Sequence, residues 1–220
     1  MAVLAYHVIF GAYGFWLPND PRGSWSVFVA SWELVRFGKA TTTEARHSLA
    51  GAAHDVQLRR EAKQALRYPP VEFTGRQALT VGLGFAQART EGGYRIHACS
   101  ILPEHVHLVI GRSERTVGRI MGHLKARATQ RLSAEGLRPS DRRPVWGHRG
   151  WKVFLWTSAD VRRSIAYVEA NPEREGKRRQ RWSFVEPYGK NTRPVNWAAN
   201  CGRAAVRGAA NSNQRLKIVE

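Results

Sequence analysis

The sequence is poor in cysteine, with only Cys99 and Cys201 in 220 residues. Two cysteines about a hundred positions apart form neither a disulfide framework nor a zinc-binding spacing, which indicates free thiols in a reducing compartment. Long apolar runs are also missing, because Arg, Lys or His interrupts each run well before membrane-spanning length. The N-terminal stretch MAVLAYHVIF lacks a basic region followed by a cleavage site. These absences predict a cytoplasmic protein with no membrane partner.

Acidic residues are scarce relative to basic ones. The chain has 35 Lys and Arg against 17 Asp and Glu, a formal net charge of +18 and a sequence pI near 11.1. Residues 112–220 contribute 24 basic and 9 acidic side chains, so most of the excess lies in the second half. This charge predicts a polyanionic partner such as nucleic acid. A ribosomal-type or merely soluble basic surface is the alternative that charge alone leaves open.

The pattern of apolar residues predicts an α+β fold. An antiparallel sheet with helices on one face, of the ferredoxin-like or RNA-recognition-like kind, fits the order of elements best. Residues 1–200 are expected to form one domain that includes a loop and helical insertion at 14–70, and residues 201–220 are expected to be a flexible tail. The expected strands are 3–10, 151–156 and a pair flanking 102–104, and the expected helices are 55–67, 75–91, 115–135 and 158–171.

Two histidines in the segment ILPEHVHLVI are candidate metal ligands. Side chains alternate along a strand, so His105 and His107 should project from the same face, while Val106 and its apolar neighbours face the core. Two imidazoles at this spacing can share one divalent ion. Because the pattern His-x-His alone is common, a structural role is the alternative. His97 is expected on the opposite face, as a core histidine.

A tyrosine on the predicted helix 158–171 is the candidate nucleophile. Val161, Ile165 and Val168 form the core stripe of this helix, whereas Arg163, Tyr167 and Asn171 form a second stripe at i, i+4 and i+8. Ser158 is expected to cap the helix and Asn171-Pro172 to end it. Asn171 could add an oxygen ligand to the two imidazoles. A half-buried surface tyrosine is the alternative for Tyr167, and a simple helix stop is the alternative for Asn171.

These segments together resemble a known family. The strand ILPEHVHLVI, the later WKVFLW, the helix IAYVEANPEREG and the loop WLPNDPRGSW are similar to the single-tyrosine HUH transposases, the IS200/IS605-like family, and most closely to its REP-associated branch. The resemblance covers roughly residues 3–187. It implies a sequence- or structure-specific single-stranded DNA endonuclease and strand transferase. In it His105 and His107 would bind Mg²⁺ or Mn²⁺, Asn171 would replace the usual Gln ligand, and Tyr167 would form a 5′-phosphotyrosine intermediate.

The expected partner is single-stranded or hairpin DNA. Aromatic side chains that could stack on bases are Trp16, Trp25, Trp146 and Trp151, although a structural role is the favoured alternative for each, because Trp usually packs into cores. The candidate DNA-binding residues are Lys125, Arg127, Arg131, Arg163, Trp151 and Lys152. Both a monomer and a homodimer are compatible with the sequence.

Three other functions are alternatives to this one. A domesticated, catalytically silent nucleic-acid-binding protein would keep the fold and the charge but form no covalent adduct. An RNA phosphoesterase of the two-histidine kind would need two separated His-x-Ser/Thr motifs, which the sequence lacks. Replication initiators and relaxases of the wider HUH class usually have larger chains.

Overall fold

The computed structural model describes residues 2–18, 20, 32–38, 53–138 and 143–189. The chain divides into two compact units, Met1–Tyr188 and Gly189–Glu220. The helices and strands given below lie in the first unit. The tail predicted at 201–220, Trp25 and part of the predicted loop lie outside the described residues.

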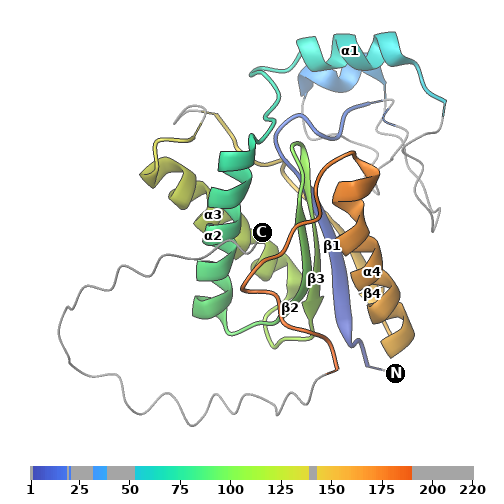
Figure 1. Cartoon of the computed structure of the whole chain (residues 1–220). Coiled ribbons are helices and arrows are strands. Elements are labelled where there is room, and N and C mark those ends of the chain that lie inside the picture. The colour runs from blue at the N-terminus through green and yellow to red at the C-terminus, as the bar shows by residue number, and fades with distance from the viewer. Residues whose placement is uncertain (1, 19, 21–31, 39–52, 139–142, 190–220) are drawn as a thin grey trace. The chain divides into compact units, whose positions relative to one another are not determined.

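A four-stranded antiparallel sheet forms the centre of the first unit (Figure 1). Its strand order is β2-β3-β1-β4, and the elements along the chain follow a ferredoxin-like β-α-β-β-α-β order. The predicted α+β class is therefore confirmed. The strands are β1 (Ala5–Gly11), β2 (Ile96–Ile101), β3 (His105–Gly111) and β4 (Trp151–Leu155).

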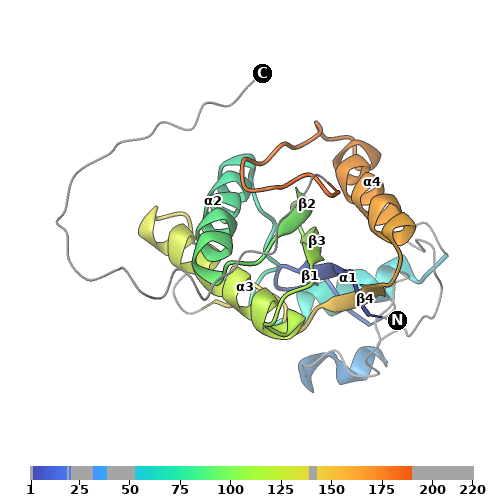
Figure 2. The ribbon, with the colours of Figure 1, turned by 90° about the horizontal axis from the view of Figure 1, so that it is seen from below.

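Helices cover both faces of the sheet, so the expectation of helices on one face is wrong. Helices α2 (Gly75–Gly92) and α3 (Val117–Ala134) pack on one face, and α4 (Ser158–Arg174) packs on the other (Figure 2). The larger core lies under α2 and α3, where alternate strand residues such as Phe10, Leu108 and Ile110 meet the apolar stripes of both helices. The smaller core lies under α4, because the other strand face also carries apolar residues, including Ala98 and Val109. This second core holds the last helix against the sheet.

The boundaries of α4 differ from the prediction at both ends. Thr157, not Ser158, caps the helix, and its side chain and that of Asp160 bond to each other's backbone N–H groups in a capping box. The helix continues through Pro172 to Arg174. Proline is tolerated there because it removes only one N–H near the end of the helix. The backbone of Glu175 still bonds to the Asn171 carbonyl at 3.3 Å.

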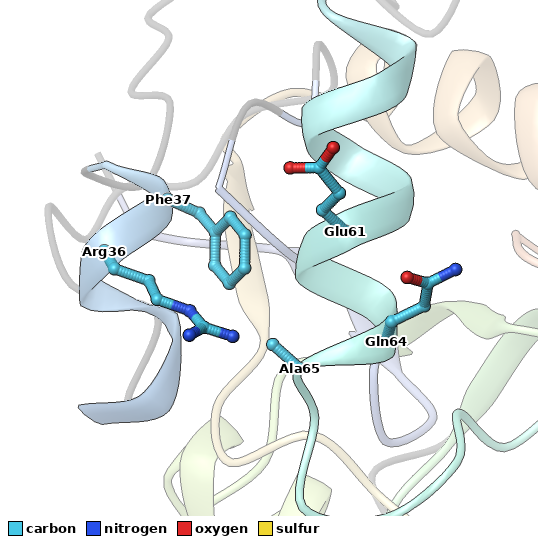
Figure 3. Close-up of a pocket in the computed structure, with 5 residues that line it drawn as sticks. All are labelled: Arg36, Phe37, Glu61, Gln64 and Ala65. Carbon is cyan, nitrogen blue, oxygen red and sulfur yellow. The ribbon is translucent and has the colours of Figure 1, made fainter.

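The predicted insertion contains two short helices, η1 (Trp32–Phe37) and α1 (Val56–Gln64). A separate small core lies between these segments and consists of Leu17, Leu34 and Ala62. A pocket of about 330 Å³ lies between η1 and α1, lined by Arg36, Phe37, Glu61, Gln64 and Ala65 (Figure 3). The candidate histidines and tyrosine belong to other elements. Within the described part of the chain, no helix has the length and apolar character needed to cross a bilayer.

The two edges of the sheet differ, because a later segment of the chain binds along β2 whereas β4 carries exposed apolar side chains. Residues after α4 return along β2, where the side chain of Gln180 bonds to the backbone N–H and carbonyl of Ile101 at 2.8 and 2.7 Å. The backbone of Glu186 also donates to Ile96 at 2.8 Å. On the opposite edge, β4 exposes Val153 and Phe154. The β2 edge is thus covered by the chain itself.

Candidate active site

The two β3 histidines lie on the sheet face that α4 covers. Val106 and Leu108 point into the large core under α2 and α3, and the alternation of the strand therefore turns His105 and His107 toward α4. Both histidines are buried, with 8% and 4% of their surface exposed. Their ring centroids lie 4.9 Å apart. The prediction that the two imidazoles share one face is confirmed.

Helix α4 brings Tyr167 to these histidines across sixty positions of sequence. The ring of Tyr167 is half-buried and meets the ring of His107 edge to face, with centroids 5.8 Å apart. Val161 and Val168 of the same helix are fully buried against the sheet, which fixes the rotation of the helix and hence the direction of Tyr167. Arg174, two turns later, holds its guanidinium 4.9 Å from the centroid of the tyrosine ring.

The structure adds His7, which was missed in the sequence. His7 lies on β1, next to β3, and its Nε2 is 3.2 Å from Nδ1 of His107. Its ring also lies 5.8 Å from that of Tyr167, centroid to centroid. The available signal was the alternation of the first strand, which places a polar imidazole on the face opposite to the buried Val8 and Phe10. Only the pairing of β1 with β3 shows that this face is the one with the other histidines.

Burial keeps His107 and His7 neutral. The pKa of His107 is lowered well below 6.5, first because burial penalises the imidazolium and then because His105 and His7 lie beside it. Burial also lowers the pKa of His7 to about 4. Neutral imidazole is the form that binds a metal ion or accepts a hydrogen bond.

The end of α4 contributes two further polar side chains. Asn171 is 6% exposed, and its Nδ2 has no hydrogen-bond partner within the protein. Glu175, one turn later, places Oε1 3.5 Å from Nε2 of His105. The sequence analysis missed Glu175 because it ended the helix at Asn171. The continuation of the helix through Pro172 is what brings this carboxylate to the histidines.

The donor set is compatible with a divalent ion. His105 and His107 offer imidazole nitrogens. Rotation of the Asn171 carboxamide exchanges its unpartnered nitrogen for an oxygen, which Mg²⁺ and Mn²⁺ prefer. Among the described residues, no three His, Cys, Asp or Glu side chains are already arranged to hold one ion. An ion would therefore rely on the two imidazoles, on Asn171 or Glu175, and on oxygens of water or substrate.

Solved structures of two other proteins are similar to this chain, whereas no family model and no curated protein matches it. A REP-associated tyrosine transposase bound to a REP hairpin is 12% identical, with 80% of this chain and 70% of that chain covered and a TM-score of 0.44. A protein of Deinococcus radiodurans R1, provisionally assigned as a transposase, is 14% identical, with 76% and 91% covered and a TM-score of 0.37. The first is described as a REP-associated tyrosine transposase and the second only as a transposase. At such identities the chemistry of the site has to be derived from the residues of this chain.

The three basic residues expected on the long helix do not surround this site. Helix α3 packs on the opposite face of the sheet. Lys125 donates to the carbonyls of Gly147 and Arg149 at 2.8 and 3.0 Å. Arg127 bonds to Glu91 at 2.7 Å, and Arg131 to Glu135 at 2.7 Å. All three side chains therefore bond to groups of the protein itself.

Of the other expected DNA-binding residues, only Trp151 shares the sheet face of the histidines. Trp151 pairs with Ile9 of β1. Ile9 lies two residues after His7 and therefore on the same face, so Trp151 shares the face of the histidines. Lys152 points to the other face, toward Gly118 of α3. Arg163 is 74% exposed and forms an ion pair with Asp160 on α4. Of the stripe Arg163, Tyr167 and Asn171, Tyr167 contacts His107 and Asn171 is buried one turn later, whereas Arg163 is exposed.

Trp146 has the structural role that the sequence favoured over base stacking: it packs on Phe10 in the large core and donates Nε1 to the Lys125 carbonyl at 3.1 Å. The predicted face of His97 is wrong. His97 is buried as predicted but lies on the same face as the site histidines, where its ring meets that of Tyr188. A register shift between Ile96 and Ala98 interrupts the alternation on which the prediction depended.

Proposed function

We propose that this chain is a divalent-metal-dependent endonuclease and strand transferase for single-stranded DNA, with Tyr167 as its nucleophile. The observation that carries the proposal is the convergence of Tyr167 with His107, and through it with His105, from elements far apart in the sequence. A tyrosine beside neutral, buried imidazoles combines a nucleophile with metal ligands. The net charge of +18 supports a polyanionic substrate.

The reaction balances without an external energy source. The phenolic oxygen of Tyr167 forms a bond to the scissile phosphorus, and the bond from phosphorus to the 3′ oxygen breaks. The phenol releases its proton to solvent, and the leaving 3′ oxygen takes up a proton from solvent. The products are a 5′-phosphotyrosine and a free 3′-OH. Attack by another 3′-OH reverses the step and joins strands, because one phosphodiester is exchanged for another.

The residues around Tyr167 have distinct roles in this proposal. A bound divalent cation would supply positive charge to the scissile phosphate and the leaving oxygen. His105, His107 and Asn171 would hold it. The guanidinium of Arg174, 4.9 Å from the centroid of the tyrosine ring, would offer positive charge to an approaching phosphate. Val161 and Val168 fix the helix so that the phenol stays aimed at the sheet.

A covalent-adduct assay tests the proposal. The full chain is incubated with single-stranded hairpin DNAs from the flanks of its own gene that carry the label at the 3′ end, which stays on the protein after cleavage, with Mg²⁺ or Mn²⁺, and is resolved on a denaturing gel. We expect a labelled adduct with the wild type, none with Tyr167→Phe and none in chelator. Tyr188→Phe is the matched control, because Tyr188 contacts Ser158 of the same helix but lies outside the proposed site.

Two results would contradict the proposal. An adduct that persists in Tyr167→Phe, or that maps to a peptide without Tyr167, removes the nucleophile. DNA binding with no adduct under any metal condition favours the silent DNA-binding protein instead.

A further inference from the structure

We propose that His7 is a positioning residue: its Nε2 accepts a hydrogen bond from Nδ1–H of His107 and so directs Nε2 of His107 toward the metal ion. This inference rests on the proposed metal site of His105 and His107. It assigns a function to a residue of β1 that the histidine and tyrosine motifs do not include.

The sheet fixes the geometry of this pair. His107 lies directly opposite Ile9, and His7 lies directly opposite Val109, so the two histidines are diagonal neighbours on the same face. Their nitrogens are 3.2 Å apart, with His7 Nε2 facing His107 Nδ1. Because β1 is paired on both sides, with β3 and with β4, the backbone that carries His7 is held firmly.

One direction of the hydrogen bond agrees with metal binding. Of two neutral imidazole nitrogens in contact, one must carry the proton and the other must accept it. A proton on Nδ1 of His107 leaves the lone pair of its Nε2 for a metal ion, whereas the opposite arrangement would protonate the nitrogen that has to coordinate. Metal-binding histidines commonly donate their second N–H to an acceptor that sets the tautomer and the ring orientation.

A role for His7 as a third metal ligand is less compatible with the structure. Within the ranges that the structure describes, no three His, Cys, Asp or Glu side chains are arranged to hold one ion. The nitrogen of His7 also faces the nitrogen of His107 directly. A nitrogen that accepts a hydrogen bond from a ligand uses the lone pair that coordination would need.

Substitutions of His7 separate positioning from bulk. Leucine removes the acceptor but fills a similar volume, whereas the side-chain oxygen of glutamine can reach the position of imidazole Nε2 and accept the same hydrogen bond. The probe is Mn²⁺ alone, titrated into the full chain without DNA and followed by electron paramagnetic resonance. We expect His7→Leu to weaken Mn²⁺ binding about 10- to 100-fold, and His7→Gln to restore it to within about threefold of wild type.

The matched control is His97→Leu. His97 is a second buried histidine on the same sheet face, and burial also lowers its pKa to about 4, but its Nδ1 faces the Glu186 carbonyl and not the site. Its substitution should leave Mn²⁺ affinity unchanged. Circular dichroism melts establish that each variant is folded.

The tautomer of His107 is a second measurement that needs no variant. Long-range ¹H–¹⁵N spectra of the metal-free wild type should show His107 protonated at Nδ1. Protonation at Nε2, or equally weak Mn²⁺ binding by the Leu and Gln variants, would overturn the inference, as would full affinity in His7→Leu or no Mn²⁺ binding by the wild type. A missing DNA adduct together with the expected Mn²⁺ and tautomer results would reject the transferase proposal and leave the role of His7 intact.

Discussion

Gly11 controls the position of an aromatic ring that packs on the candidate metal site. It lies opposite His105 in the sheet, and the ring of Phe15 stacks on His105 with centroids 4.5 Å apart and planes inclined by 23°. A Cβ atom at position 11 would lie 2.5 Å from Cβ and 2.6 Å from Cδ1 of Phe15. These distances are far below van der Waals contact, so Gly11→Ala must move Phe15 away from His105.

The cost of this substitution follows from the contacts it breaks. Forcing a methyl group into packed space typically costs about 1–3 kcal/mol, and losing an aromatic stack costs about 0.5–1.5 kcal/mol. A loss of about 2–4 kcal/mol should lower the melting temperature by roughly 4–16 °C for a chain of this size. Mn²⁺ affinity should fall as well, because the ring that supports His105 is displaced.

Circular dichroism melts with and without Mn²⁺ measure both effects. Gly122→Ala is the control, since nothing lies within 4 Å of a Cβ atom at that position of α3. Alanine in the middle of a helix should stabilise it by about 0.5–1 kcal/mol. Adding Phe15→Gly to Gly11→Ala removes every side-chain atom of Phe15 that clashes, so the double variant should be more stable than the sum of the two single changes predicts. An unchanged melting temperature and an unchanged Mn²⁺ affinity in Gly11→Ala would contradict this expected clash with Phe15.

Three further outcomes are expected. The folded pKa values of His7 and His97, about 4 against an ordinary 6.5, mean that the unfolded chain takes up protons first as the solution is acidified. In chelator, the free energy of unfolding from urea titrations should therefore be constant above pH 6.5. Below it, the free energy should fall by about 1.4 kcal/mol per pH unit per histidine down to pH about 4. A flat profile would contradict the buried, neutral state. Glu175→Gln should weaken Mn²⁺ binding up to about fivefold, because a half-exposed carboxylate 3.5 Å from His105 contributes no more than about 1 kcal/mol; unchanged affinity would exclude the carboxylate from the site. Lys125→Met should lose about 1–3 kcal/mol by leaving two carbonyls without their ammonium donor, yet keep the salt dependence of DNA binding. A salt slope reduced by about one would show instead that Lys125 contacts phosphate.

Periodicity was sufficient to predict most of the fold. The strands and long helices follow alternation and helical spacing closely, because each element has one strongly apolar face. The placement of α4 could not be predicted in this way. Its core stripe shows that it packs on something, but the apolar residues of the second sheet face that it covers, Ala5, Ala98 and Val109, are small and scattered along three strands.

The candidate site was only partly accessible from sequence for a similar reason. His105, His107 and Tyr167 lie in motifs with internal spacing, so they could be found within short segments. His7 joins them only through the β1–β3 pairing, which links positions 100 residues apart. Glu175 depends on a proline that is tolerated inside the last helical turn. The helical pattern predicts Lys125 on the surface. Its ammonium bonds to the carbonyl of Gly147, 22 residues later, and the sequence around Lys125 does not indicate this contact.

The strand order also has a consequence for the way the protein is made. β1 is synthesised first, yet both of its partners, β3 and β4, follow about a hundred residues or more later. At about 5–20 residues per second on the ribosome, the first strand waits roughly 5–20 seconds for β3. During that time the apolar side chains of Val8 and Phe10 have no sheet to enter. Pairing so distant along the chain makes the pairing of β1 a slow step of folding, so His7 should meet the histidines of β3 late in folding.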